Sequence, residues 1–196
     1  MKYYSQVGQD EFVLKILNYP KSGYFIDIGC HKPEFINNTK TMEDLGWNGL
    51  AFDLIEYEDF SKKRKCKFIN GDCQHHDYNK IFSEENVPYI VDYLSLDIDE
   101  ASLSVLKKLP LDKYRFKVIT IEHDYYIYGD FIRNEQRQIL KGKNYKLLCS
   151  DVANYDSNNQ PVYFEDWWID SQFIDIDKIK LIECDKMLYD IVLNRF

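Results

Sequence analysis

Short runs that are almost wholly apolar alternate along this chain with stretches whose apolar residues recur at helical spacing. The apolar runs cover residues 24–29, 49–53, 66–69, 89–96 and 116–121. Strands that are hydrophobic on both faces are typical of a parallel sheet with helices packed on each side. Crossovers between parallel strands are right-handed, so the alternation predicts an α/β fold, a three-layer Rossmann-like sandwich.

The stretches between these runs predict the covering helices. Their apolar spacing and their flanking Gly or Pro residues place helices at residues 10–17, 39–45, 57–63, 79–85, 101–109 and 130–140. Two further strands are expected near residues 145–149 and 162–168, and the tail from 171 to 196 is expected to add a strand turn and a helix. No repeat or linker interrupts the pattern, so residues 1–196 are expected to form a single domain.

The charge balance excludes one class of partner. The chain carries 25 Lys and Arg against 33 Asp and Glu, a net charge of −8, whereas nucleic-acid-binding proteins usually present a basic stripe. The basic run around Arg64, from Lys62 to Lys67, is interpreted as a solvated helix end. No nucleic-acid partner is therefore expected.

Cysteine usage and hydropathy predict the compartment. The five cysteines are odd in number and contain no Cys-x-x-Cys pair, so neither a disulfide framework nor a zinc site is indicated. No stretch approaches the roughly 20 apolar residues of a membrane span. We expect a cytoplasmic protein without membrane contact, and the sequence leaves its oligomeric state open.

Polar residues follow the predicted strands at the points where they end. Ligands of open α/β sheets bind beyond the carboxyl ends of the strands, so these side chains are expected to gather at one edge. The residues are Asp27 and Gly29, then Asp53, Asp72, Asp97 with Asp99, and finally Glu122 with His123.

The first three of these strand ends predict a nucleoside pocket. Gly29 permits close backbone approach, Asp53 is placed to accept both hydroxyls of a ribose, and Asp72 could bond the edge of an adenine. An Asp-x-Gly run alone is common in turns, and Asp53 is what favours a nucleoside. His31 and Glu34 stand where a dinucleotide fingerprint has glycines, which disfavours a pyrophosphate and an NAD-dependent oxidoreductase. S-adenosylmethionine is the common cofactor that fits.

Four blocks of the sequence resemble one family in their order. SQVGQDEFVL, GYFIDIGCHKPEFINNTKTMEDLGWNGLAFD, VDYLSLDIDEASLSVL and VITIEHDYY are similar to successive blocks of FkbM-like S-adenosylmethionine-dependent methyltransferases, over about residues 4–150. The resemblance implies the class I methyltransferase fold, with a seven-stranded sheet in the order 3-2-1-4-5-7-6 and strand 7 antiparallel. It also implies O-methylation of a hydroxyl on a sugar or glycan.

The resemblance also assigns site residues. Gly29 and its neighbours would lie along the cofactor, Asn38 and Thr39 near its methionine end, and the segment from Gln6 to Asp10 would close over the site. After strand 4 the family often has D-x-E-G-x-E where this chain reads DIDEAS, a departure that concerns the acceptor more than the cofactor. Together the two arguments predict cofactor contacts at Gln6, Asp27, Gly29, Cys30, His31, Asn38, Thr39, Asp53, Leu54, Asp72 and Asp97.

Methyl transfer to a sugar hydroxyl needs help with the proton, because the hydroxyl is a poor acid. We expect His123 to act as the base, assisted by Asp97, Asp99 and Glu122. Alternatively, Asp97, Glu122 and His123 would hold Mg²⁺ or Mn²⁺, or Asp99 would simply begin the next helix. The tyrosines at 125, 126 and 128 are candidates for acceptor binding. The competing function is a non-catalytic methyltransferase-like module that binds carbohydrate or protein.

Overall fold

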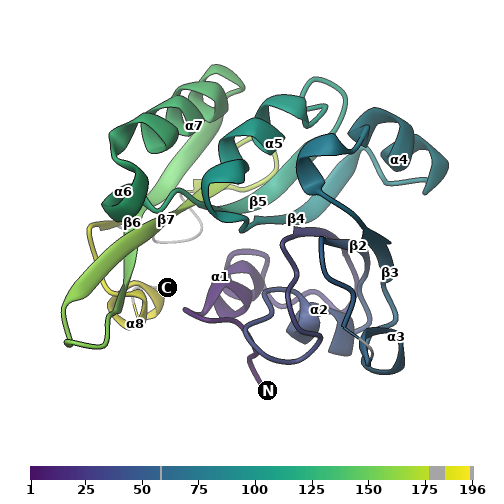
Figure 1. Ribbon diagram of the computed structural model, residues 1–196, viewed down its shortest axis with the longest axis horizontal. Coiled ribbons are helices and arrows are strands. Elements are labelled where there is room, and N and C mark those ends of the chain that lie inside the picture. Colours follow the sequence, from purple (N-terminus) through teal and green to yellow (C-terminus); the bar gives the residue numbers. More distant parts are fainter. Residues whose placement is uncertain (58, 177–183, 195–196) are drawn as a thin grey trace.

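One sheet organises the molecule. The computed structural model describes residues 1–57, 59–176 and 184–194, and within them eight strands pair in the order β3-β2-β1-β4-β5-β7-β6-β8 (Figure 1). Their bounds are β1 Tyr24–Ile28, β2 Asn48–Asp53, β3 Lys67–Asn70, β4 Ile90–Leu96, β5 Arg115–Glu122, β6 Tyr145–Tyr155, β7 Pro161–Asp170 and β8 Cys184–Asp185.

The predicted sheet order is confirmed, with one strand added. β1 to β5 pair in parallel, and β7 runs antiparallel between β5 and β6. The addition is β8, a two-residue strand that pairs in parallel with the outer edge of β6. It lies in the tail where the sequence predicts a strand turn, but so short a segment carries no periodicity of its own from which its bounds could be predicted.

Helices cover both faces of this sheet (Figure 1). α4, α5 and α7 lie on one face, and α1, α2 and α8 lie on the other. The helices are α1 Gln9–Ile16, α2 Lys40–Asp44, α3 Phe60–Lys63, α4 Tyr78–Glu84, α5 Ser102–Lys108, α6 Tyr125–Tyr128, α7 Asp130–Gly142 and α8 Tyr189–Leu193, with 3₁₀ turns at Cys73–His75 and Asp99–Ala101. In the described parts of the chain, no helix combines the length and the apolar character needed to cross a bilayer.

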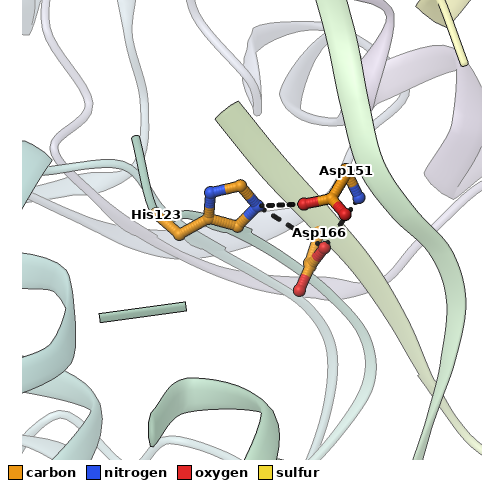
Figure 2. A group of neighbouring side chains, drawn as sticks. All are labelled: His123, Asp151 and Asp166. Carbon is orange, nitrogen blue, oxygen red and sulfur yellow. Dashed lines mark hydrogen bonds and ion pairs between the residues drawn. The ribbon is translucent and has the colours of Figure 1, made fainter. Parts of the chain in front are cut away.

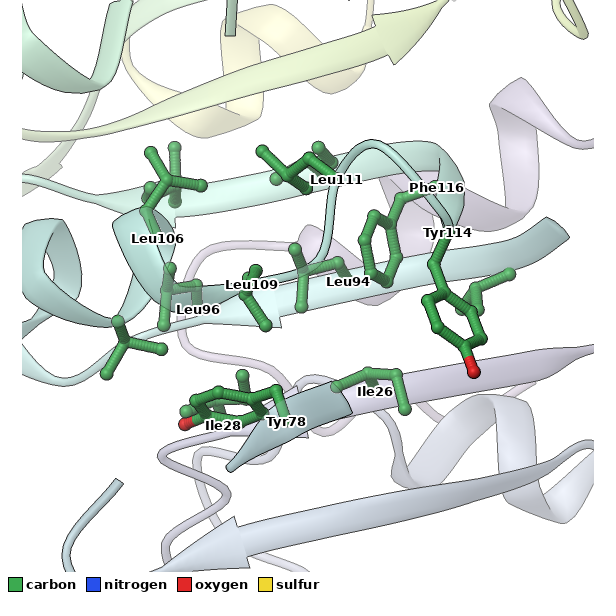
Figure 3. Close-up of a cluster of buried hydrophobic side chains, with 14 of the residues drawn as sticks. Ile26, Ile28, Tyr78, Leu94, Leu96, Leu106, Leu109, Leu111, Tyr114 and Phe116 are labelled. Atoms are coloured by element: carbon green, nitrogen blue, oxygen red, sulfur yellow. The ribbon is translucent and has the colours of Figure 1, made fainter. Parts of the chain in front are cut away.

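Two apolar cores fill the spaces between these layers. Successive strand residues point to opposite faces, so Ile26 and Ile28 of β1 pack under α4 and α5, whereas Phe25 packs toward α2 (Figure 3). On the second face, Phe12 of α1 lies against Trp167 of β7, with ring centroids 4.4 Å apart. The sheet is therefore buried on both sides, as its apolar strands predict.

Arg64 corrects the interpretation of the basic run. Its side chain is buried after α3, where Nε contacts Glu43 Oε1 at 3.1 Å, Nη1 donates to Asn37 Oδ1 at 2.8 Å and Nη2 donates to Thr39 Oγ1 at 2.9 Å. The four lysines of the run are exposed, as a solvated helix end predicts. The prediction is wrong for Arg64, because three of its donors bond acceptors in and beside the loop before α2.

Candidate functional site

A cavity of about 400 Å³ lies where β1, β2 and β4 end. Backbone bonds from Gly29 to Phe52 and from Asp97 to Ile28 keep these three carboxyl ends level with one another. The residues that line the cavity are Gln6, Gly29, His31, Ile36, Asp53, Leu54, Asp72, Cys73, Asp97, Ile98, Asp99 and Ala101. The structure thus brings together seven of the predicted cofactor residues with Asp99, and Lys and Arg are missing from this lining.

Gly29 lets the ends of β1 and β4 pack closely together beside the cavity. Its φ is +90°, in the left-handed region, and an added Cβ would lie 1.8 Å from the Asp97 carbonyl oxygen. Any other residue would push the two strand ends apart.

Two backbone N–H groups orient the Asp53 carboxylate. The N–H of His31 donates to Oδ2 at 2.8 Å, and the N–H of Ile55 donates to Oδ1 at 3.0 Å. His31 itself has a φ of +50°, which turns its N–H toward Asp53. Each carboxylate oxygen keeps a second lone pair, so Asp53 can accept further hydrogen bonds from a diol.

Four predicted cofactor residues do not line the cavity. Asp27, Cys30, Asn38 and Thr39 are all buried. Thr39 Oγ1 donates to Asp27 at 2.6 Å, and Asn38 Nδ2 donates to Ser95 Oγ at 2.9 Å. Burial raises the pKa of Asp27 to about 6 and raises that of the Cys30 thiol above its usual range. These side chains lie behind the lining of the cavity, and their contact with a cofactor stays a prediction.

Carboxyl groups crowd the end of the cavity between β4 and β5. Glu122 Oε2 accepts the N–H of Asp99 at 3.0 Å, and the side chains of Glu122 and Asp97 are hydrogen-bonded to each other. Burial and repulsion by Asp99 raise the pKa of Asp97, burial and repulsion by Asp97 raise that of Glu122, and burial beside Asp99 and Asp97 raises that of Asp124 to about 7. Two adjacent carboxylates cannot both stay ionised cheaply, so this group holds at least one proton near neutral pH.

His123 lies beside Asp151 and Asp166 (Figure 2). It is fully buried, and its Nε2 is 3.5 Å from Asp151 Oδ1 and 3.5 Å from Asp166 Oδ1. Arg133 Nη1 pairs with Asp151 at 2.7 Å and Arg137 Nε pairs with Asp166 at 2.7 Å. We call these five side chains the His123 group.

The position of His123 follows from strand geometry. Its N–H bonds the carbonyl of Phe164 at 2.7 Å, which extends the pairing of β5 with β7 by one residue. Adjacent residues of an extended strand point to opposite faces, so Glu122 and His123 cannot share a site. The structure therefore does not bring His123 together with Asp97 and Glu122, as the predicted base and the predicted metal set require. Asp99, Glu122 and Asp124 can bring one oxygen each within 4.8 Å of one another, but acidic clusters of this kind are common without a metal.

One polar contact beside the site was missed from the sequence. Gln9 Nε2 donates to Glu165 Oε2 at 3.0 Å, and Trp167 Nε1 donates to the same oxygen at 2.9 Å. Burial raises the pKa of Glu165 to about 8. The available signal was the pair Glu165 and Asp166 inside an otherwise apolar strand, because charged groups are buried there only with partners.

Comparison with known proteins identifies the fold of the chain. No protein-family profile and no curated protein sequence matches the chain. Its structure is similar to a putative rRNA methylase from Clostridium thermocellum, with a TM-score of 0.54 and 15% identity over 87% of this chain and 97% of that one. It is also similar to the 1,6-didemethyltoxoflavin N1-methyltransferase of Burkholderia thailandensis, whose structure holds S-adenosylhomocysteine, with a TM-score of 0.54 and 12% identity over 83% and 76%.

A further similarity, to the Dnmt2 methyltransferase of S. pombe, has a TM-score of 0.52 and 12% identity over 75% of this chain and 50% of that one. The shared feature of these structures is the α/β fold of class I S-adenosylmethionine-dependent methyltransferases. The chain has this fold, with β8 as an additional edge strand.

Proposed function

We propose that this protein is an S-adenosylmethionine-dependent methyltransferase that transfers a methyl group to a hydroxyl of a sugar or glycan, as the resemblance to FkbM-like enzymes implies. The observation that supports the cofactor is Asp53, which two backbone N–H groups orient in a cavity that Gly29 also lines. The cavity has the size of a small-molecule site.

The lining supports a nucleoside without phosphates. Asp53 would accept the ribose hydroxyls, and Asp72 lies at the same end of the cavity, after β3. Phosphate groups are usually bound by Arg, Lys or a helix N-terminus, and four aspartates line this cavity instead. The positive charge of a sulfonium is compatible with that environment.

The carboxyl group beside the cavity supports the chemistry. In the transfer, the bond between the methyl carbon and sulfur breaks as a bond from the acceptor oxygen to that carbon forms, and the hydroxyl proton must leave. A base acts best when its pKa lies near the working pH. Asp124, whose pKa burial raises to about 7, would take that proton in place of His123, while Glu122, whose pKa is raised to about 11, stays protonated beside it.

The assignment of the acceptor rests on the resemblance and on α6. Tyr126 and Tyr128 of this helix are exposed, and Tyr128 Oη donates to Glu100 Oε2 at 2.9 Å, next to Asp99 of the cavity. Tyrosine rings beside carboxylates offer a sugar both a stacking surface and hydrogen-bond acceptors.

The cofactor is tested by calorimetry on Asp53→Ala. Loss of the charge-assisted bonds to the ribose is expected to weaken S-adenosylmethionine binding by roughly 1.5–3 kcal/mol. Asp112→Ala, which removes an exposed carboxylate far along the chain from the cavity, is the charge-matched control and should bind like the wild type. Equal affinity of Asp53→Ala and the control would contradict the proposed pocket.

A methyl-transfer assay distinguishes an enzyme from a non-catalytic binding module. Wild-type protein with methyl-labelled S-adenosylmethionine and a panel of glycans is expected to label a glycan hydroxyl. Glycan binding without any label, together with failure to bind the cofactor, would instead support the non-catalytic module.

A further inference from the structure

The first residues of the chain form one wall of the cavity. We call residues 4–10 the N-terminal strap. Gln6 is exposed at its centre and lines the cavity opposite the strand ends. The residues on either side of Gln6 are held by side-chain bonds, and Gln6 itself is left to face the cavity.

Asp10 fixes the first half of the strap. Its buried carboxylate accepts the N–H of Tyr4 at 2.8 Å and the hydroxyls of Ser5 and Thr41. Thr41 belongs to α2, so this half is tied to the helix beneath β1 and β2. The carbonyl of Tyr4 also accepts the N–H of Asn37 at 3.0 Å.

Gln9 fixes the second half in the opposite direction. Its Oε1 accepts the N–H of Val7 at 3.0 Å, and its Nε2 donates to Glu165 on β7. Gln9 and Glu165 are both buried, and 156 residues separate them in the sequence. This single amide therefore connects the backbone beside Gln6 to the far half of the sheet. Gly8, between the two halves, packs so closely on Leu193 that an added Cβ would lie 2.4 Å from Cδ1.

We propose that the hydrogen bond between Gln9 and Glu165 is a latch that holds the N-terminal strap in place, so that Gln6 contacts the ligand bound in the cavity. Gln9 and Glu165 are positioning residues, because neither lines the cavity, and Gln6 is the residue that touches the ligand. The identity of that ligand, S-adenosylmethionine, rests on the proposed function, whereas the latch itself does not.

The test exchanges the two partners. Gln9→Glu places two carboxylates face to face and, at pH 8.5, is expected to open the latch. Gln9→Glu combined with Glu165→Gln restores one amide and one carboxylate, and is expected to close it again. Gln138→Glu makes the same change at an exposed position of α7 and is the control. Gln9→Met removes both bonds without adding a charge, in case the like-charged variant does not fold.

The first measurement is hydrogen exchange without ligand. The amides of Ser5 and Val7 are expected to exchange about tenfold faster in Gln9→Glu and Gln9→Met than in the wild type, the worth of one hydrogen bond. Amides of β4 should be unchanged, which shows that the sheet is folded. The double variant Gln9→Glu/Glu165→Gln and the control Gln138→Glu should show the exchange rates of the wild type at Ser5 and Val7. Unchanged exchange at Ser5 and Val7 in both single variants would overturn the latch.

The second measurement is S-adenosylmethionine affinity. Gln6→Ala and Gln9→Glu are each expected to bind about tenfold more weakly, and only Gln9→Glu should be rescued by Glu165→Gln. Wild-type affinity in Gln6→Ala would overturn the contact between Gln6 and the ligand. If the wild type itself does not bind the cofactor, the proposed function fails, and the exchange measurement still decides the latch.

Discussion

Glu165 is a carboxyl group held where its neutral form is favoured. Burial raises its pKa from 4.5 to about 8, even though Gln9 and Trp167 donate to it and favour the ionised form. A folded state that binds the proton more tightly than the unfolded state loses stability as the pH rises between the two pKa values. The stabilising contribution is therefore complete below about pH 4.5 and is lost as the pH rises through 8.

Glu165→Gln makes this linkage measurable, since an amide keeps the shape and does not titrate. The free energy of unfolding of the wild type, minus that of the variant, is expected to fall by up to roughly 4 kcal/mol between pH 4.5 and pH 8. Urea denaturation of both proteins at several pH values measures the difference. A difference that stays constant with pH would show that Glu165 titrates normally.

Individual site residues were predictable where a strand end determines them. Asp53 and Gly29 follow apolar runs directly, so the positions of their side chains at the cavity follow from the strands. Asn38 and Thr39 lie in a loop, where Asn38 donates to Ser95 on β4 and Thr39 accepts a bond from Arg64, which reaches it from after α3. A contact of that kind joins separate segments, and no local pattern in the sequence predicts it.

At the level of elements, the His123 group joins the end of β5 to β6, β7 and α7. Burial alone would raise the pKa of Asp166, but the bond from Arg137 and the nearby His123 imidazole hold that pKa below its usual range. Removing the imidazole takes away a nitrogen that lies 3.5 Å from each of the buried Asp151 and Asp166 carboxylates, and leaving buried groups short of a polar partner costs about 1–3 kcal/mol.

His123→Ala is accordingly expected to lower the free energy of unfolding by about that amount. Because the imidazole lies on the other face of β5 from Glu122, affinity for S-adenosylmethionine at a temperature where both proteins are folded should stay at the wild-type value. Denaturation and calorimetry on the same samples test the pair of expectations. Wild-type stability with a loss of methyl transfer would restore the role of a base to His123.

Element order was more predictable than element ends. Apolar strands separated by helices predict the sandwich, and the resemblance supplies the order of the strands. The face on which a residue just beyond a strand lies was not predictable, because it depends on whether pairing continues, as it does from His123 to Phe164. The end of β6 at Tyr155 was not predictable either, because its bulges break the alternation that would otherwise mark its length.

At the scale of the whole molecule, the charged side chains that line the cavity are predominantly negative. The chain carries a net charge of −8, and the described lining of the cavity contains Asp53, Asp72, Asp97 and Asp99. His31 is the only titratable nitrogen side chain in that lining. Such a field attracts cations and repels anions over distances set by the ionic strength.

This field predicts a difference between the proposed substrate and product. S-adenosylmethionine carries one methyl group and one positive charge more than S-adenosylhomocysteine, and the two are otherwise identical. The salt dependence of the ratio of their affinities therefore reports the sulfonium charge, because the contact made by a neutral methyl group does not depend on ionic screening. We expect this ratio to favour S-adenosylmethionine most at low salt and to fall as the ionic strength rises, because the Debye length shortens from about 30 Å at 0.01 M to about 8 Å at 0.15 M. Calorimetry with both ligands across that range measures this ratio.

Asp72→Asn should flatten the salt dependence of the ratio, whereas Asp112→Asn, an exposed control, should not. A ratio that does not change with salt would show that the aspartates of the lining are neutralised before the ligand arrives.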